Sequence, residues 1–196
     1  MTNRQNHPPS PGTDPPPAPR RRKRHTYFFN ARYWLRDLIL SICIALAIVF
    51  FLYQPVQVEG TSMMPRLGAH QRLLVNKFLY KFEPIARGDI VVFRFPGDPS
   101  KSYIKRVVGL PGDQVEVQEG RVIIDNKVLR EPYLAPGHGD RRSYSMIQIP
   151  PGHYYVMGDH RDSSHDSRQW GTVHQSSIYG KAVFCYWPFE SFGSVD

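Results

Sequence analysis

Apolar residues follow two different patterns along the chain. Between Leu38 and Tyr53 no residue is charged, whereas after Pro55 the apolar residues fall into short segments separated by turn residues. An uninterrupted apolar run favours a helix in a membrane, and short segments of alternating character favour β-strands. The sequence therefore predicts one apolar helix followed by a mainly β domain.

The apolar run has the features of a single transmembrane anchor. Its 16 residues, 38–53, are somewhat fewer than the roughly 20 that cross a bilayer. The aromatic segment 33–35 lengthens the run, and the charged head of Arg36 can reach the membrane interface. A cleaved signal peptide is the alternative, but no small-x-small site closes the run. We therefore predict an anchor over residues 31–54.

Six segments after the anchor have the composition of strands. They cover residues 72–77, 90–95, 103–108, 114–118, 121–125 and 153–157. Glu119-Gly120 is typical of a hairpin loop, and further turns are expected at the four Pro-Gly pairs, 96–97, 111–112, 136–137 and 151–152. We predict a mainly β fold, in which residues 55–196 form a small barrel-like domain of short antiparallel strands.

Charge is concentrated before the anchor. Residues 1–37 hold eight Lys or Arg against two acids, a net charge of +6 out of the formal +8 of the whole chain. The domain therefore lacks the basic face of a nucleic-acid-binding protein. Residues 1–19 contain seven prolines, so we expect the basic segment 1–30 to be a disordered tail. Positive charge ahead of the anchor predicts a cytoplasmic tail and an extracytoplasmic domain.

Three stretches of the domain carry candidate chemistry, and the first surrounds Ser62. This serine follows two small residues in the segment 59–67, EGTSMMPRL. Small neighbours allow a substrate backbone to approach closely. Ser62 also lies only nine residues after Tyr53, which keeps it within roughly 30 Å of the end of the anchor.

The second stretch is YIKRVVGLPGD, residues 103–113. Side chains alternate between the two faces of a strand, so Lys105 shares a face with Tyr103 and Val107. Burial among such neighbours lowers the pKa of a lysine, because the charged form loses most on leaving water. A neutral amine can then accept the proton of a serine hydroxyl. A solvent-facing strand lysine is the alternative.

The third stretch, residues 158–171, is a polar loop rich in hydrogen-bonding groups. Its histidines and acids do not follow an established metal-ligand spacing, so we predict no metal and no cofactor; the residues weighed were His160, Asp162, His165 and Asp166. A Ser-His-Asp relay of Ser163, His165 and Asp166 is also excluded, since such close sequence neighbours can hardly adopt its geometry.

Together, and in this order behind an anchor, the three stretches resemble the bacterial type I signal peptidases (leader peptidases). The matching blocks are QPVQVEGTSMMPRL (54–67), RGDIVVFRFPGDP (87–99), YIKRVVGLPGD (103–113) and GDHRDSSHDSR (158–168). The resemblance implies a β-rich barrel-like catalytic core and a membrane-bound serine endopeptidase. Its nucleophile would be Ser62 and its general base Lys105, with no histidine. Ser164 would orient the lysine amine, and Asp166 with Arg168 would form a bracing ion pair.

The resemblance also implies a substrate and a location. The substrate would be a secreted precursor protein with small residues at −1 and −3, cleaved at the outer face of the bacterial plasma membrane. Its side chains would occupy shallow apolar subsites, which we place at Val56, Val58, Met63, Leu67, Tyr103 and Ile104. The partners are thus precursors and the lipid bilayer, with no nucleic acid; the oligomeric state stays open.

The chain departs from the family pattern at four positions. Gly60 stands where some members have a serine that donates to the oxyanion, so the oxyanion would rest mainly on the Ser62 backbone N–H. Arg66 replaces a threonine, His160 an asparagine and His174 a proline. None of these changes removes a catalytic group.

Two other classes of function remain open from the sequence. One is a Ser-Lys self-cleaving regulator that resembles the SOS repressors, although the anchor and the lack of a helix-turn-helix argue against it. The other is a non-catalytic, membrane-tethered β-module. A further open point concerns four apolar residues that either face lipid or close the β core: Met64, Trp187, Phe189 and Phe192.

Overall fold

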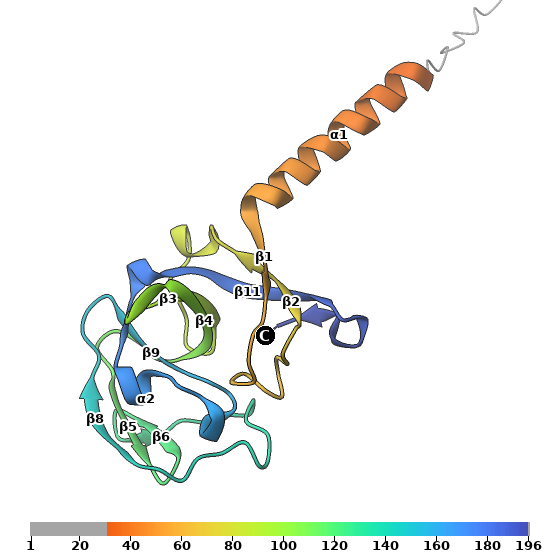
Figure 1. The fold of residues 1–196 in the computed structure, drawn as a ribbon. Helices are drawn as coiled ribbons and strands as arrows, with labels where there is room; N and C mark the ends of the chain where they lie inside the picture. The colour runs from red at the N-terminus through yellow and green to blue at the C-terminus, as the bar shows by residue number, and fades with distance from the viewer. Residues whose placement is uncertain (1–30, 196) are drawn as a thin grey trace, which may run out of the picture. The chain divides into compact units, whose positions relative to one another are not determined.

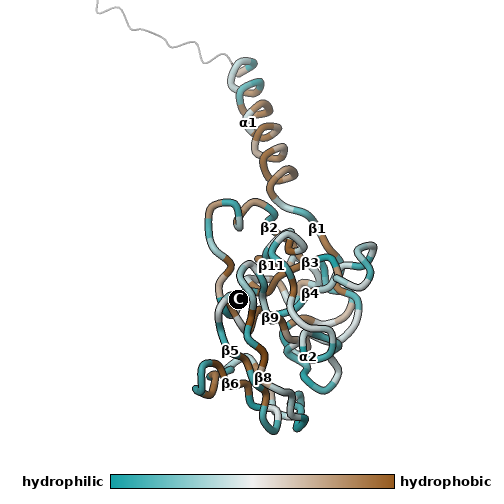
Figure 2. The backbone as a smooth tube through the Cα atoms, turned by 90° about the vertical axis from the view of Figure 1, so that its left-hand side faces the viewer, coloured by the Kyte–Doolittle hydropathy of each residue, from teal (hydrophilic) through white to brown (hydrophobic). Residues whose placement is uncertain are grey.

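The computed structural model describes residues 31–195, so the predicted tail over residues 1–30 lies outside the described part. Helix α1 spans Ala31–Leu52 and is long and apolar enough to cross a membrane. Figure 2 shows its apolar character along most of its length. The helix ends two residues before the predicted end of the anchor, because Tyr53 already pairs with Asn76 in a sheet.

The main sheet of the domain has eight antiparallel strands (Figure 1). From one edge to the other its order is β1 (Tyr53–Gln57), β2 (Arg72–Asn76), β11 (Ile178–Trp187), β3 (Ile90–Phe95), β4 (Asp98–Gly109), β9 (His153–Met157) and β10 (Val173–His174), with β12 (Gly193–Ser194) beside β11. The prediction of a mainly β domain of antiparallel strands behind one apolar helix is confirmed. The sheet runs as an open path from β1 to β10.

A second, smaller sheet contains four antiparallel strands. Its order is β7 (Lys127–Val128), β6 (Arg121–Ile124), β5 (Gln114–Gln118) and β8 (Tyr144–Gln148). Short helices occupy the connections: η1 (Leu79–Lys81), η2 (Arg161–Ser163), α2 (Ser167–Trp170), η3 (Gln175–Ser177) and η4 (Phe189–Ser191).

Two predicted turns have the backbone geometry that their residues favour: the hairpin turn between β5 and β6 and the turn that links β4 to β5. Glu119 and Gly120 both have positive φ, 48° and 80°, as the two-residue loop of a type I′ turn requires. Their hairpin pairs Gln118 with Arg121. Gly112 has φ 91° and follows Pro111, the arrangement of a type II turn. The predicted turns at these two places are confirmed.

All six predicted strands are present, with small differences at their ends. The largest difference is in β4, which begins at Asp98 instead of residue 103 because it forms a hairpin with β3 around the Pro-Gly pair 96–97. Strand β11 was not predicted from the sequence, although it lies inside the main sheet between β2 and β3.

The core beneath the segment around Ser62, residues 59–67, joins distant parts of the chain. Met63 and Leu67 are buried there with Leu73 of β2 and Cys185 of β11. Ile104 of β4 packs against the same cluster. Val58 before Ser62 belongs to the same cluster, so apolar burial on both sides of Ser62 holds the segment between β1 and β2 in place.

Candidate active site

Ser62 and Lys105 meet although 43 residues separate them. Ser62 lies in the turn after β1, and Lys105 lies in β4, where it is opposite Val91 of β3. Lys105 Nζ is 2.5 Å from Ser62 Oγ. The lysine is only 5% exposed, so the contact is formed largely out of water.

Burial sets the protonation of Lys105. Loss of hydration lowers its pKa to about 8, and the nearby Arg168 guanidinium acts in the same direction. The carboxylates of Asp166 and Asp159 oppose this shift, because they favour the ammonium form. Unlike an ordinary lysine, this one can hold a neutral amine close to neutral pH.

The loop that begins at Gly158 holds the backbone at Ser62. The His160 N–H donates to the Ser62 carbonyl over 3.0 Å, and His160 Nδ1 lies 3.2 Å from the Thr61 carbonyl. At Gly158, an added Cβ would lie 2.4 Å from the Ser62 carbonyl oxygen and 2.3 Å from Ser164 Oγ. Only glycine therefore allows the two segments to approach this closely.

Asp166 and Arg168 form a buried ion pair next to this loop. Arg168 Nε donates to Asp166 Oδ1 over 2.8 Å, and the Gly158 N–H donates to Asp166 Oδ2 over 3.0 Å. Burial opposes ionisation of Asp166, but the Arg168 guanidinium and the Gly158 N–H outweigh it and hold the pKa of the carboxyl below its usual range. Arg168 also pairs with Asp140.

Two further buried ion pairs support the site and were not found by sequence reasoning. Arg106, next to Lys105, makes two hydrogen bonds to the carboxylate of Asp159. Arg161 is fully buried, pairs with Glu131 and donates to the Gly158 carbonyl. The only sequence signal for these pairs was the presence of charged residues in segments expected to be buried. The partners in each pair are too far apart in the sequence for that signal to show which acid binds which arginine.

Gly60 and Ser164 are two further residues to which the sequence assigned a supporting role, and the structure bears on each of them differently. Gly60 has φ 89°, a conformation that a residue with a Cβ adopts only with strain, so the backbone itself accounts for glycine there. Ser164 is buried beside Gly158. Among the described residues it makes no hydrogen bond to Lys105, so its role in orienting the amine stays a prediction.

A cleft of about 440 Å³ contains Ser62 and Lys105. Four of the six predicted subsite residues line it: Val56, Val58, Tyr103 and Ile104. Met63 and Leu67, 1% and 2% exposed, do not line it and lie in the core, where Val58, 3% exposed, joins the same cluster from the wall of the cleft. Glu59, Ser163 and His165 also line the cleft and were not predicted as subsite residues.

The histidines and acids that were considered as metal ligands make other contacts in the structure. Within residues 31–195 no group of three His, Cys, Asp or Glu is arranged to hold a metal ion. His160 Nε2 lies 3.0 Å from Asp162, and the ring of His165 lies 6.3 Å from that of Phe95. Asp166 is held by Arg168.

Comparisons with known proteins agree on one family. The family model described as "Signal peptidase, peptidase S26" matches residues 31–187. The signal peptidase I of Bacillus amyloliquefaciens is 37% identical over 87% of this chain and 90% of its own length. The probable signal peptidase I-1 of Synechocystis is 36% identical over 81% and 83%. A signal peptidase I crystal structure from Enterococcus faecalis matches half of this chain and 97% of its own, with 29% identity and TM-score 0.45.

The family and its relatives identify the protein as a serine peptidase, and the structure adds a mainly β domain and an N-terminal apolar helix. The chain belongs to the signal peptidase family, peptidase S26. Family and helix together indicate a membrane-anchored hydrolase that acts on precursors with signal peptides.

Proposed function

We propose that this protein is a membrane-bound serine endopeptidase that removes signal peptides from secreted precursors with a Ser62-Lys105 dyad. The observation that carries the proposal is the contact of 2.5 Å between Lys105 Nζ and Ser62 Oγ inside a cleft. A buried lysine with a lowered pKa next to a serine hydroxyl is a base next to a nucleophile.

The proposed reaction has two stages. Neutral Lys105 takes the proton of Ser62 as Oγ attacks the scissile carbonyl, and the resulting ammonium gives that proton to the leaving amine. An acyl-enzyme remains on Ser62. Lys105, neutral again, takes a proton from water as the water attacks the ester, and the released Ser62 oxygen recovers a proton from the lysine.

Charge on the tetrahedral oxygen would be stabilised by backbone. Among the described residues, no acceptor is bonded to the Ser62 N–H, so this donor is available to an oxyanion. Gly60 supplies no hydroxyl here. His160 Nδ1 lies 3.2 Å from the Thr61 carbonyl, which shares its peptide plane with the Ser62 N–H, and this contact would help to pre-orient the donor.

The cleft and the anchor support the finer assignments. Val56, Val58, Tyr103 and Ile104 give it an apolar lining, which suits small alkyl side chains at −1 and −3. The positive-inside rule supports a single-pass protein in the bacterial plasma membrane, with a cytoplasmic N-terminal tail over residues 1–30, the anchor within 31–54 and residues 55–196 on the outer face.

Cleavage of a synthetic precursor by the full-length protein in detergent tests the proposed function. We expect one cut, after alanine at −1, and a loss of roughly tenfold or more when leucine replaces that alanine, because the cleft must then admit a larger side chain. Cutting within the protein's own chain, at a rate independent of enzyme concentration and without precursor cleavage, would instead identify a self-cleaving regulator.

The pH dependence of precursor cleavage tests the protonation of Lys105. Because only the neutral amine acts as base, kcat/KM should rise about tenfold per pH unit below the pKa and level off above about 8. Circular dichroism at each pH controls for unfolding. A profile that still climbs near 10.5, the ordinary pKa of lysine, would show that the amine is solvated and would contradict the dyad.

Trp187, Phe189 and Phe192 are exposed, so among the described residues they do not close the core. Their exposure supports the lipid-facing alternative raised by the sequence. Met64 is half-buried.

A further inference from the structure

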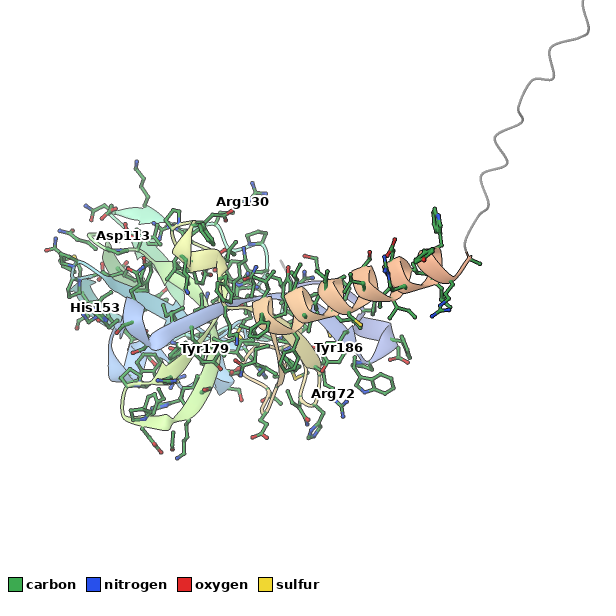
Figure 3. The ribbon with its side chains drawn as sticks, turned by 90° about the horizontal axis from the view of Figure 1, so that it is seen from above. Arg72, Asp113, Arg130, His153, Tyr179 and Tyr186 are labelled. Carbon is green, nitrogen blue, oxygen red and sulfur yellow. The ribbon has the colours of Figure 1, made fainter. Side chains whose placement is uncertain are left out.

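A small basic pocket lies beside the catalytic cleft and has no part in the proposed reaction. It has a volume of about 280 Å³ and is lined by Gln54, Lys77, Arg94, Ser102 and Tyr179. Each of these residues comes from a different one of five adjacent strands of the main sheet, or from the residue that follows it: β1, β2, β3, β4 and β11. Tyr179 is labelled in Figure 3.

The pocket carries positive charge without a counter-charge. Lys77 and Arg94 are both exposed, and among the described residues neither forms an ion pair. No acid lines the pocket. Asp89, a buried carboxylate just before β3, is held by Lys181 over 2.7 Å and by the Tyr80 hydroxyl over 2.9 Å. Two cations and three hydrogen-bonding side chains therefore face the same hollow.

A second hollow extends the first. It measures about 550 Å³ and shares Lys77 and Tyr179 with the basic pocket. Lys81 lines it, with its amine 4.5 Å from the centre of the Phe78 ring. The neighbouring Phe82 is 84% exposed. Exposed aromatic and basic residues in one short segment are typical of a chain that meets the membrane interface.

The backbone places the pocket next to the end of the apolar helix. The Lys77 N–H donates to the carbonyl of Leu52, the last residue of α1, over 3.2 Å. If α1 crosses the bilayer, Leu52 lies at the membrane surface, and the basic pocket must lie there as well. This holds for any orientation of the domain, because the bond joins Lys77 directly to the helix end.

We infer that the basic pocket binds the phosphate of an anionic phospholipid headgroup. Lys77 and Arg94 would bind the phosphate oxygens, since ammonium and guanidinium groups form strong charge-assisted hydrogen bonds with phosphate. Gln54, Ser102 and Tyr179 add neutral donors. Ser102 also lines the catalytic cleft, so a bound lipid would lie beside the place where the substrate enters. This inference rests on the membrane anchor and not on the catalytic proposal.

Direct binding to the full-length protein in an uncharged maltoside detergent tests the inference. The probes are dihexanoylphosphatidylglycerol, dihexanoylphosphatidylcholine and inorganic phosphate, titrated at constant ionic strength by calorimetry. We expect saturable binding of phosphatidylglycerol only. The double variant Lys77→Gln with Arg94→Gln should bind phosphatidylglycerol roughly thirtyfold more weakly. Each basic residue near a membrane surface contributes about fivefold to the affinity, and two such factors multiply.

A matched variant removes the same charge elsewhere. Arg121 and Lys127 are exposed on the second sheet, and Arg121→Gln with Lys127→Gln should leave the affinity unchanged. An equal loss in this variant would reduce the effect to net charge and overturn the site. Equal binding of phosphatidylcholine would overturn the preference for an anionic headgroup.

The remaining outcomes identify another source for the anion. Inorganic phosphate that binds as tightly as the lipid would make the pocket a soluble-anion site. If Lys77→Gln with Arg94→Gln changes only the KM of a soluble precursor peptide and not lipid binding, the pocket belongs to the substrate. Because lipid binding is measured without turnover, a failure of the dyad proposal would leave this result intact, and the reverse also holds.

Discussion

Replacement of Ser62 or of Lys105 by alanine is expected to abolish nearly all precursor cleavage. Each single variant should lose a factor of roughly 10⁴ or more in kcat/KM, and the double variant should be little worse than either. The reason is that in the proposed dyad the lysine amine and the serine hydroxyl, which are in contact over 2.5 Å, would act as one unit. Steady-state kinetics on the three variants measure this non-additivity.

Two exposed residues of β4 provide matched controls. Ser100→Ala and Lys101→Ala remove the same side-chain types from the same strand, and both variants should retain wild-type kcat/KM. Losses in the Ser62 and Lys105 variants that simply multiply in the double variant would argue against a dyad. Retained thermal stability of the single variants would separate loss of chemistry from loss of fold.

Asp166→Asn is expected to have two effects that a purely structural residue would not combine. Loss of the carboxylate leaves the buried Arg168 poorly compensated, which costs about 3–5 kcal/mol for a buried pair. Asp140, which also pairs with Arg168, should place the loss near the lower value. Because Asp166 raises the pKa of Lys105, its removal should also shift the rising limb of the pH profile to lower pH.

Urea unfolding measures the first effect, and kcat/KM against pH measures the second. Asp98→Asn is the control, because Asp98 is a partly exposed acid that pairs with Lys101 at the surface; it should change neither measurement. A pH profile for Asp166→Asn that moves to higher pH would contradict the electrostatic arrangement described for the site.

The sequence proposed Ser62 and Lys105 as a pair, and the structure brings their side chains together, but the sequence did not predict what buries them. Alternation along β4 placed Lys105 and Arg106 on opposite faces, and the structure buries both. This is possible because β4 lies within the sheet with core on each side: Val107 belongs to one apolar cluster and Val108 to another. A period of two identifies faces, but it does not say whether one face or both are covered.

Strand β11 was missed because its local pattern is irregular. Its pairing with β2 shifts register between Ala182 and Phe184 and again between Cys185 and Trp187. Such β-bulges interrupt alternation, so the apolar residues do not fall at every second position. The buried arginine pairs were missed for a different reason. Arg106 and Asp159 are 53 residues apart, and only the folded chain brings them together.

The close packing at Gly158 restricts how this protein can vary. Every codon change that replaces this glycine adds a Cβ, and that atom would lie 2.4 Å from the Ser62 carbonyl oxygen. The segment around Ser62 would have to move, and it is fixed by the buried Met63 and Leu67. Bacteria that become resistant to an inhibitor of the cleft should therefore not carry substitutions at Gly158. Resistance substitutions should instead occur at residues on the rim of the cleft.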